Sequence, residues 1–280
     1  MKYLNLGCGS HYSIQHEWTN LDFISTGTGV ITHNLLKGIP FDNESFDLVY
    51  HSHVLEHFSK EDGEKLVGEC FRVLKPGGVI RIAVPDLERI AINYLTYLEQ
   101  GLNNPADEMI AKNYEWTLLE MYDQTVRNVT GGNMAKYLFQ DTIKNEDFVF
   151  ERLGEEAKSL RKNYWTTTEN KSAEDPSHVA KPTSIISVSR MKRKIKEYLF
   201  KRLHVDTEVM QTGKFRLSGE IHQWMYDRFS LSTLLKNKGG RNIQKRDAFT
   251  SYVTNWSNYG LDSNKNVVRK PDSLFMEAVK

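Results

Sequence analysis

Residues 3–10 read Tyr3-Leu4-Asn5-Leu6-Gly7-Cys8-Gly9-Ser10, a short apolar stretch that runs directly into a turn with two glycines. Glycine lets the backbone turn sharply, and because it has no Cβ it also lets a ligand approach the chain closely. The stretch therefore predicts a strand over residues 3–6. Its carboxyl end, at Gly7, Cys8 and Gly9, is expected to open onto a bound ligand.

The residues up to position 86 continue as alternating strands and helices. Expected strands cover residues 18–23, 29–34, 46–52 and 79–84, and an expected helix covers residues 60–74. The helix has apolar residues at helical spacing and ends at the breaker Lys75-Pro76-Gly77-Gly78. Strands separated by helices or short crossovers predict an α/β fold, with a mostly parallel sheet and helices on both of its faces.

Polar side chains stand where these strands end. Asp22 ends the second strand and Asn34 the third, while His51 and Ser52 end the fourth. In parallel sheets, ligands bind at the carboxyl ends of the strands. The sequence therefore predicts one ligand site along this edge, formed by these side chains and by the turn at residues 7–9.

The middle of the chain loses the alternation. Residues 87–217 read mainly as helices, the first of which Asp86 is expected to cap, and a polar stretch over 166–184 reads as a loop. The α/β pattern then returns, with expected elements over residues 230–238, 242–250 and 273–279. We therefore expect one core domain, built from residues 1–86 and 218–280, with a mainly helical insertion at 87–217.

Composition excludes several classes of protein. Lys and Arg number 37 against 36 Asp and Glu, so the charge balance gives no argument for a nucleic-acid partner. Two cysteines, Cys8 and Cys70, are too few for a disulfide framework or for a zinc site of thiolates alone. No apolar run reaches the about 18 residues that a membrane span needs, and the N-terminus lacks the apolar core of a signal peptide. These features favour a cytoplasmic protein in a reducing setting.

These motifs resemble the class I S-adenosylmethionine-dependent methyltransferase family. The resemblance is close over residues 2–86 and loose over the closing strands. It runs through residues 3–9, Asp22, Ile39-Pro40-Phe41, Phe46-Asp47-Leu48-Val49, Val54-Leu55-Glu56-His57 and Val73-Leu74-Lys75-Pro76-Gly77-Gly78. Several such signals in the family's order are far more specific than one isolated Gly-x-Gly.

The resemblance implies a Rossmann-like fold, S-adenosyl-L-methionine as the cofactor and a particular set of contacts. The turn at residues 7–9 would lie against the methionine part of the cofactor, and Asp22 would bind the ribose hydroxyls. Asn34 would lie near the adenine. His51 and Ser52 would end the fourth strand beside the cofactor.

Two departures from the family pattern affect the expected site. Gly9 and Asp22 are thirteen residues apart, so we expect the usual helix between the first two strands to be reduced to a turn around residues 13–17. The chain also begins at the first strand, without the helices that often cover the substrate. The insertion at 87–217 is therefore the expected substrate cap. Some family members that modify sugars and surface glycans look similar in this opening and in the closing Lys270-Pro271-Asp272-Ser273-Leu274.

Methyl transfer to an oxygen requires removal of a proton, and histidine is the usual base near neutral pH. His222 is the first candidate, because residues 219–227 return from the insertion to the core and should place it across the cleft from the cofactor. His53 and His57, just past the fourth strand, come next, followed by His11. Each also has a structural interpretation: a packed connector for His222, a surface side chain for His53 and an anchor of the turn for His57.

No metal site is expected from the sequence. The histidines lack the paired spacing with carboxylates or thiolates that would suggest one, and the pair His51-x-His53 on one strand face is a weak signal. Because some oxygen methyltransferases use a divalent ion, the sequence leaves a metal site open.

A basic segment over residues 187–204 combines seven Lys and Arg residues with an apolar face. This segment could contact an anionic membrane surface or bind a phosphorylated, lipid-linked substrate. The interpretation that we favour is an amphipathic cap helix with a solvated charged face. Since the rest of the chain shows no matching basic field, a nucleic-acid partner is not expected.

The sequence thus predicts an enzyme that moves a methyl group from S-adenosyl-L-methionine to an oxygen, or in second place a nitrogen, of a small molecule, sugar or glycan. The alternative is a catalytically inactive, methyltransferase-like binding or regulatory protein, because Gly7, Gly9 and Asp22 indicate cofactor binding and not turnover. A nicotinamide dehydrogenase is disfavoured. The turn runs on through His11 and Tyr12 without the third glycine or alanine of a Gly-x-Gly-x-x-Gly motif.

Overall fold

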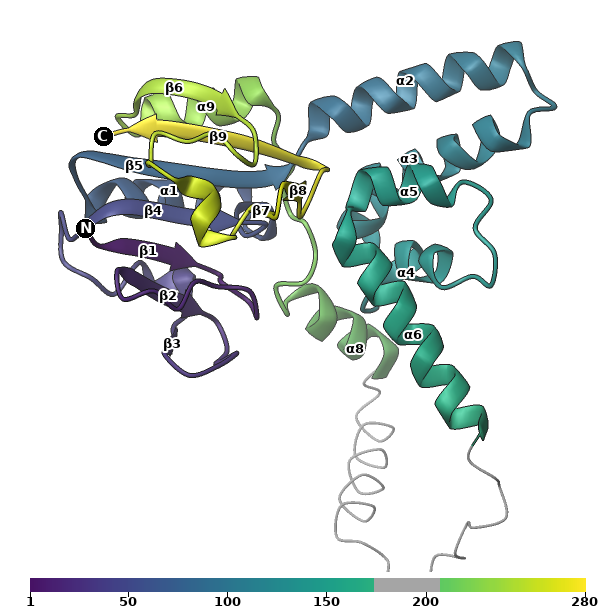
Figure 1. Cartoon of the computed structure of the whole chain (residues 1–280), viewed down its shortest axis with the longest axis horizontal. Coiled ribbons are helices and arrows are strands. Elements are labelled where there is room, and N and C mark those ends of the chain that lie inside the picture. The colour runs from purple at the N-terminus through teal and green to yellow at the C-terminus, as the bar shows by residue number, and fades with distance from the viewer. Residues whose placement is uncertain (174–206) are drawn as a thin grey trace, which may run out of the picture.

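The computed structural model describes residues 1–173 and 207–280, which form a seven-stranded sheet with a group of helices beyond one end of it (Figure 1). The strand order is β3-β2-β1-β4-β5-β9-β6. The strands are β1 (Tyr3–Leu6), β2 (Trp18–Asp22), β3 (Val30–Thr32), β4 (Phe46–Ser52), β5 (Leu74–Pro85), β6 (Arg241–Arg246) and β9 (Ser273–Val279). Neighbouring strands pair in parallel except at β9, which is antiparallel to both β5 and β6. The mostly parallel, Rossmann-like α/β fold predicted from the sequence is confirmed.

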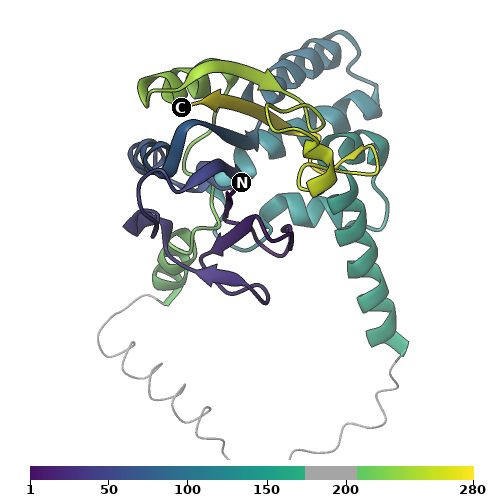
Figure 2. The ribbon, with the colours of Figure 1, turned by 60° about the vertical axis from the view of Figure 1, so that its left-hand side comes forward.

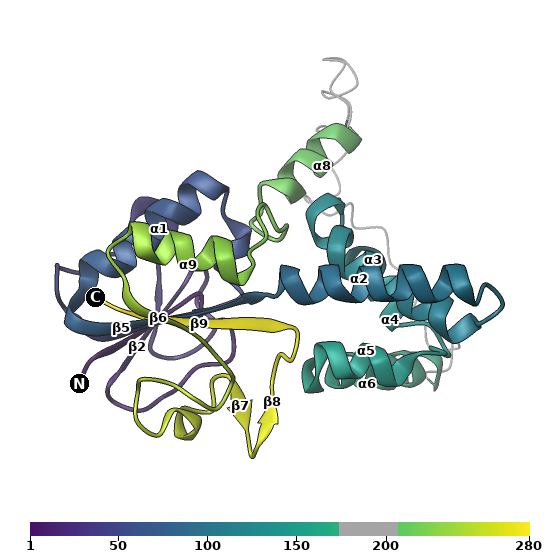
Figure 3. The same ribbon diagram turned by 90° about the horizontal axis from the view of Figure 1, so that it is seen from above.

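One face of the sheet is covered by α1 (Lys60–Val73) and α9 (Arg228–Asn237), which lie above the sheet in Figure 3. Apolar side chains recur at helical spacing in α1 and are buried in the same core as the strands: Leu66, Val67, Cys70 and Phe71. Ser59 caps the N-terminus of α1, because its hydroxyl accepts a hydrogen bond from the Asp62 backbone N–H at 3.1 Å. This face therefore holds the main core of the domain.

The opposite face carries an aromatic layer, supplied in part by a mostly irregular covering segment (residues 247–262). Trp18 and Tyr50 pack on this face from β2 and β4. Trp256, which begins the short 3-10 helix η4 (Trp256–Tyr259), packs on both of them. Its ring centroid lies 5.2 Å from that of Tyr50 and 6.3 Å from that of Trp18. Aromatic burial thus shields this face from water, so in the described part of the chain it has an aromatic layer where the sequence predicts helices.

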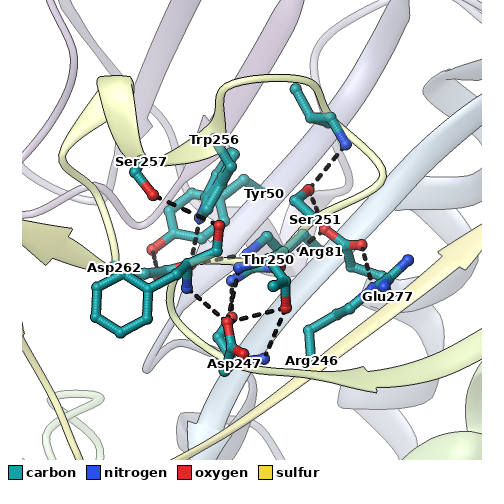
Figure 4. Close-up of polar contacts among 12 residues, drawn as sticks. Tyr50, Arg81, Arg246, Asp247, Thr250, Ser251, Trp256, Ser257, Asp262 and Glu277 are labelled. Atoms are coloured by element: carbon teal, nitrogen blue, oxygen red, sulfur yellow. Dashed lines mark hydrogen bonds and ion pairs between the residues drawn. The ribbon is translucent and has the colours of Figure 1, made fainter. Parts of the chain in front are cut away.

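A buried arginine joins the covering segment to the sheet (Figure 4). Arg81 of β5 is fully buried, and its Nε lies 2.7 Å from Oδ2 of Asp262 while its Nη1 lies 3.0 Å from Oε1 of Glu277. Its terminal nitrogens also donate to the backbone carbonyl oxygens of Thr250 at 2.9 Å and of Asp247 at 2.7 Å. A buried charge is tolerated when it is paired and hydrogen-bonded in this way. The guanidinium therefore fixes the covering segment against β5 and β9.

The other helices lie beyond the carboxyl end of β5, and Figure 2 shows α6 extending well past the sheet. They are α2 (Leu87–Asn103), α3 (Glu108–Val126), α4 (Gly132–Leu138), α5 (Glu146–Leu153), α6 (Glu155–Ala173) and α8 (Thr207–Arg216). They bury an apolar cluster of their own and an ion pair in which Arg152 Nη2 lies 2.9 Å from Glu120 Oε2. We therefore keep our proposal that residues 87–217 are inserted into a core of residues 1–86 and 218–280.

Short elements complete the described chain: η1 (Leu35–Lys37), η2 (Leu55–His57), β7 (Ser263–Asn264) and β8 (Val267–Val268).

The expected reduction of the first crossover helix to a turn is confirmed, and Asp86 caps α2 by accepting from the Arg89 N–H at 3.2 Å. The loop expected from residue 166 is wrong at its start, because α6 continues to Ala173. The basic segment 187–204 lies outside the described residues. No helix in the described part of the chain is both long and apolar enough to cross a membrane.

Replacing Arg81 with methionine should destabilise the fold strongly. The substitution leaves the carboxylates of Asp262 and Glu277 buried and unpaired, and breaking a buried ion pair in this way costs about 3–5 kcal/mol. Urea denaturation of Arg81→Met measures the loss in the free energy of unfolding. Lys65→Gln is the control, because its ion pair with Asp62 lies at the surface and contributes little. Equally mild effects of both substitutions would contradict the role given to Arg81.

Candidate functional site

Three hollows open at the carboxyl edge of the sheet. The large cleft, of about 730 Å³, is lined among others by Gly7, Asp22, Asn34 and His57. The loop hollow, of about 290 Å³, is lined among others by Cys8, Gly9, Ser52 and Arg269. The helix hollow, of about 240 Å³, is lined among others by Trp116, Arg127, Met134 and Lys270. His53 lines all three, so this side chain stands where the edge of the sheet and the helices meet.

The two glycines after β1 serve different purposes. Both have positive φ, +62° at Gly7 and +56° at Gly9, which residues with a Cβ rarely adopt. A Cβ at Gly7 would lie 2.3 Å from Cγ2 of Val54, so Gly7 also permits close packing against the chain that follows β4. A Cβ at Gly9 would meet nothing within 4 Å among the described residues. Gly9 therefore faces open space that a ligand can approach.

Asp22, at the end of β2, holds the turn at residues 7–9 in place. Its Oδ2 accepts a hydrogen bond from the Gly9 N–H at 2.8 Å, and its Oδ1 accepts one from the Ile24 N–H at 3.2 Å. An ionised carboxylate has about four acceptor sites, so acceptor capacity remains where Asp22 lines the large cleft. The position suits both the structural role of closing the turn and the binding of two neighbouring hydroxyls.

Asn34 and Ser52 lie at the same edge but in different hollows. Asn34 lines the large cleft, and its Oδ1 accepts a hydrogen bond from the Leu36 N–H at 3.0 Å, which caps η1. This cap leaves the Nδ2 donors of Asn34 for a ligand. Ser52 lines the loop hollow together with Cys8 and Gly9.

His51 lies away from the hollows. Side chains alternate along β4, so Tyr50 and Ser52 line the loop hollow while His51 points to the other face of the sheet. Its ring is fully buried, neither ring nitrogen has a hydrogen-bond partner within the described ranges, and burial lowers its pKa to about 4. The expected position of His51 beside a cofactor is therefore corrected: His51 belongs to the core.

Cys8 lines the loop hollow but is not a reactive thiol. The residue is buried, and burial together with the nearby charge of Asp22 raises its pKa to about 11. A thiol with such a pKa stays protonated near neutral pH and is a poor nucleophile. Cys8 therefore contributes its backbone and its small size to the turn.

His53 is held in an unusual conformation where the hollows meet. Its φ of 54° is rare for a residue other than glycine and indicates that the surrounding packing determines the position. Its Nε2 lies 2.7 Å from Oγ of Ser273, and its Nδ1 lies 3.4 Å from Oε1 of Glu56. Burial lowers the pKa of His53 well below the usual range, so the ring is neutral near neutral pH.

His57 and His222 pack edge to face, with ring centroids 4.9 Å apart. His57 lines the large cleft, and its Nδ1 lies 3.2 Å from the carbonyl oxygen of Ile221. His222 is 4% exposed, and burial lowers its pKa to about 3. It is not among the described residues that line the three hollows. The expectation that His222 faces the cleft is therefore corrected, because its neighbours Ile221 and Gln223 occupy that wall.

Glu56 is a candidate that the sequence reasoning missed. It is fully buried in η2, neither carboxyl oxygen has a hydrogen-bond partner among the described residues, and burial raises its pKa to about 8. Three side chains that can bind a metal ion come together here: Glu56, His57 and His222. Each offers one ligand atom, and these three atoms lie within 4.8 Å of one another. Adjacent Glu56 and His57 were visible in the sequence, but nothing in the sequence marks the distant His222 as their neighbour.

The chain matches a known family and a known protein locally. A family model described as a methyltransferase domain matches residues 10–82. A probable S-adenosylmethionine-dependent methyltransferase of Mycolicibacterium smegmatis is 41% identical over 56 residues. That match covers 20% of this chain and 21% of the relative, so the chain aligns with about a fifth of the relative's length.

Two solved structures align over the whole chain. One is an S-adenosylmethionine-dependent methyltransferase from Thermotoga maritima, described as a possible histamine N-methyltransferase, with 10% identity, a TM-score of 0.39, and coverage of 100% of this chain and 82% of that one. The other is an S-adenosylmethionine-dependent methyltransferase from Archaeoglobus fulgidus, with 12% identity, a TM-score of 0.37, and coverage of 100% and 86%. At these TM-scores the two similarities carry no conclusion about this chain.

Cys8 and Cys70 should resist alkylation in the folded protein. Because burial raises the pKa of Cys8 to about 11, only about 0.1% of it is thiolate at pH 8, and Cys70 is fully buried. Iodoacetamide at pH 8 should label the native protein at least about 100-fold more slowly than the same protein in guanidinium chloride. Mass spectrometry of the labelled peptides measures both sites. Rapid labelling of Cys8 in the native protein would show that the turn holds an activated thiol instead.

Proposed function

We propose that this chain, a member of the class I S-adenosylmethionine-dependent methyltransferase family through the domain at residues 10–82, transfers a methyl group from S-adenosyl-L-methionine to an oxygen of a small molecule, sugar or glycan. The observation that carries the proposal is the link between Gly9 and Asp22. It places an open backbone turn and a carboxylate with spare acceptors side by side at the edge where parallel sheets bind ligands. A nitrogen acceptor is the second choice.

The edge of the sheet has groups that suit each part of the cofactor. Asp22 can accept hydrogen bonds from the ribose hydroxyls, and Gly9 leaves room for the methionine part. Arg269, in the loop hollow beside the turn, suits the methionine carboxylate. At the large cleft, Asn34 and the exposed Phe23 suit the adenine. S-adenosyl-L-methionine bound there supplies an electrophilic methyl group on a positively charged sulfur.

The protein's part in the reaction is to orient the acceptor and to keep water out. Holding two reactants in line lowers the barrier by several kcal/mol, on the order of 7–11 kcal/mol in favourable cases. The helix hollow opens at His53, next to the edge that carries the turn at residues 7–9. An acceptor seated among the helices would therefore present its hydroxyl at that edge.

Among the four histidines considered from the sequence, His53 has the position that suits a base. It lines the large cleft, the loop hollow and the helix hollow together. The hydroxyl of Ser273, 2.7 Å from Nε2, fixes the ring, and Oε1 of Glu56 lies 3.4 Å from Nδ1. In this proposal the acceptor's hydroxyl displaces that of Ser273 at Nε2 of His53, and Nε2 then receives the acceptor's proton.

The lining of the helix hollow favours a sugar or glycan among oxygen acceptors. Apolar side chains such as Met134 and Leu160 stand beside charged ones such as Arg127, Glu156 and Lys270. A sugar presents both an apolar ring face and several hydroxyls, and mixed linings of this kind bind such ligands. The closing residues 270–274 support the same choice through their resemblance to glycan-modifying members of the family.

We also propose a reducing, cytoplasmic setting for the protein. Cys8 and Cys70 are both free and buried. Free thiols without disulfides are typical of proteins from reducing compartments.

Replacing His53 should slow methyl transfer while leaving cofactor binding nearly unchanged. His53→Gln removes the base but keeps a hydrogen-bonding side chain, and loss of a general base lowers kcat by about 10²–10⁴-fold. Release of S-adenosylhomocysteine by the full chain is measured with a panel of monosaccharides and nucleotide sugars. His16→Gln, at an exposed histidine, is the control and should match the wild type.

The same assay separates the competing functions. Release of S-adenosylhomocysteine that needs an amine acceptor would move the assignment to nitrogen. If the wild type binds S-adenosylhomocysteine but forms none from S-adenosyl-L-methionine with any hydroxyl or amine acceptor, the enzymatic function is refuted. The inactive binding protein is then the remaining interpretation.

A further inference from the structure

We propose that Glu56, His57 and His222 form a binding site for a divalent transition-metal ion. One possible ligand atom from each side chain lies within 4.8 Å of the other two. Two imidazoles and one carboxylate are a common donor set for Zn²⁺ and for other first-row metal ions such as Co²⁺, Mn²⁺ and Fe²⁺. The proposal goes beyond methyl transfer, because ion binding needs neither cofactor nor acceptor.

The first support is that the cluster holds buried polar atoms without partners. Glu56 is fully buried, and neither of its carboxyl oxygens accepts a hydrogen bond from any described residue. Nδ1 of His222, which is 4% exposed, also lacks a hydrogen-bond partner in the described part of the chain. Buried polar groups in native proteins are nearly always satisfied, so unsatisfied ones on two neighbouring residues point to a ligand there. A cation between them would satisfy both residues at once.

The second support is the orientation of His57. Its Nδ1 lies 3.2 Å from the carbonyl oxygen of Ile221, which can only accept, so Nδ1 carries the proton. The lone pair of the neutral ring is then on Nε2. Histidine ligands of metals usually donate their other ring N–H to a carbonyl or carboxylate, which fixes the tautomer and the ring. The backbone of Ile221 thus prepares His57 as a ligand, and it belongs to the residue next to His222.

The two positively charged side chains near the cluster are each paired with a carboxylate, which reduces their repulsion of a bound cation. Arg127 pairs with Glu220 at 3.2 Å, and Lys270 has Glu156 at 3.6 Å. The contact of His53 with Glu56, 3.4 Å between Nδ1 and Oε1, is longer than a good hydrogen bond and involves neither His57 nor His222. A simple ion pair between His53 and Glu56 therefore does not account for the whole cluster.

The three side chains need a small adjustment to close on an ion. Bonds of about 2.0–2.2 Å in a tetrahedral site put ligand atoms about 3.4 Å apart, so separations of up to 4.8 Å must shrink by rotation of the side chains. His57 also lines the large cleft, which leaves an open side for a further ligand.

The binding test uses the full chain freed of metal with a chelator. Calorimetry with Zn²⁺ should give one ion per chain, and Co²⁺ should produce visible absorption that Zn²⁺ abolishes. Loss of a group that only hydrogen-bonds to a metal ligand weakens metal binding about 10–100-fold. Glu56→Gln and His222→Gln remove ligands themselves, so each should weaken Zn²⁺ binding by at least that factor. His16→Gln removes an exposed histidine outside the cluster and should bind Zn²⁺ like the wild type.

X-ray absorption of the zinc-loaded wild type keeps the test decisive even if a variant fails to fold. The proposal predicts two imidazole nitrogens and a carboxylate oxygen at about 2.0–2.2 Å from the zinc. The proposal is overturned if the folded wild type binds no stoichiometric ion, if the first shell lacks two imidazoles, or if both folded variants bind Zn²⁺ as well as the wild type. Since neither cofactor nor acceptor is present, these outcomes are independent of whether methyl transfer occurs.

Discussion

The buried charge of Arg81 is the constraint on which the rest of the structure depends. From the middle of β5 it binds Asp262 and Glu277, and Asp262 in turn accepts from the hydroxyl of Tyr50 at 2.6 Å and from Nε1 of Trp256 at 2.9 Å. This network holds the covering segment on a face that has little helix to protect it. The network also fixes where the chain re-enters the sheet at β9. Oγ of Ser273, the first residue of β9, lies 2.7 Å from Nε2 of His53. The core and the candidate site are therefore coupled through one guanidinium.

Local patterns were enough to predict most of the fold. The strand and two-glycine turn at residues 3–10, the helix that ends at Val73 and the cap at Asp86 all depend on neighbours in the sequence, and the structure shows each of them. The short link from Gly9 to Asp22 likewise predicted a turn in place of a crossover helix. The covering segment was not predicted, because its aromatic packing and its salt bridges to Arg81 join residues that are far apart in the chain.

The site was predictable only where one strand end decides the position. Asp22 lies at the cleft as expected, since the end of β2 fixes it. His51 was misplaced although the information was present: strand alternation sends Ser52 and His51 to opposite faces. The grouping of Glu56 with His222 depends on how the chain returns from the helices to the core. The backbone N–H of Gln223 donates to the carbonyl oxygen of Glu56 at 2.7 Å, a tertiary contact that no sequence pattern signals.

Our proposal has S-adenosyl-L-methionine bind at the turn after β1 with its ribose on Asp22. Calorimetric titration of the full chain with S-adenosylhomocysteine, beside the Asp22→Ala variant, measures this binding. We expect saturable binding of one molecule per chain. In the variant, binding should be lost or weakened at least about tenfold, in line with the about 1.5–3 kcal/mol that a hydrogen bond to a charged group contributes. No binding by a well-folded wild type, or equal binding by a folded Asp22→Ala protein, would contradict it.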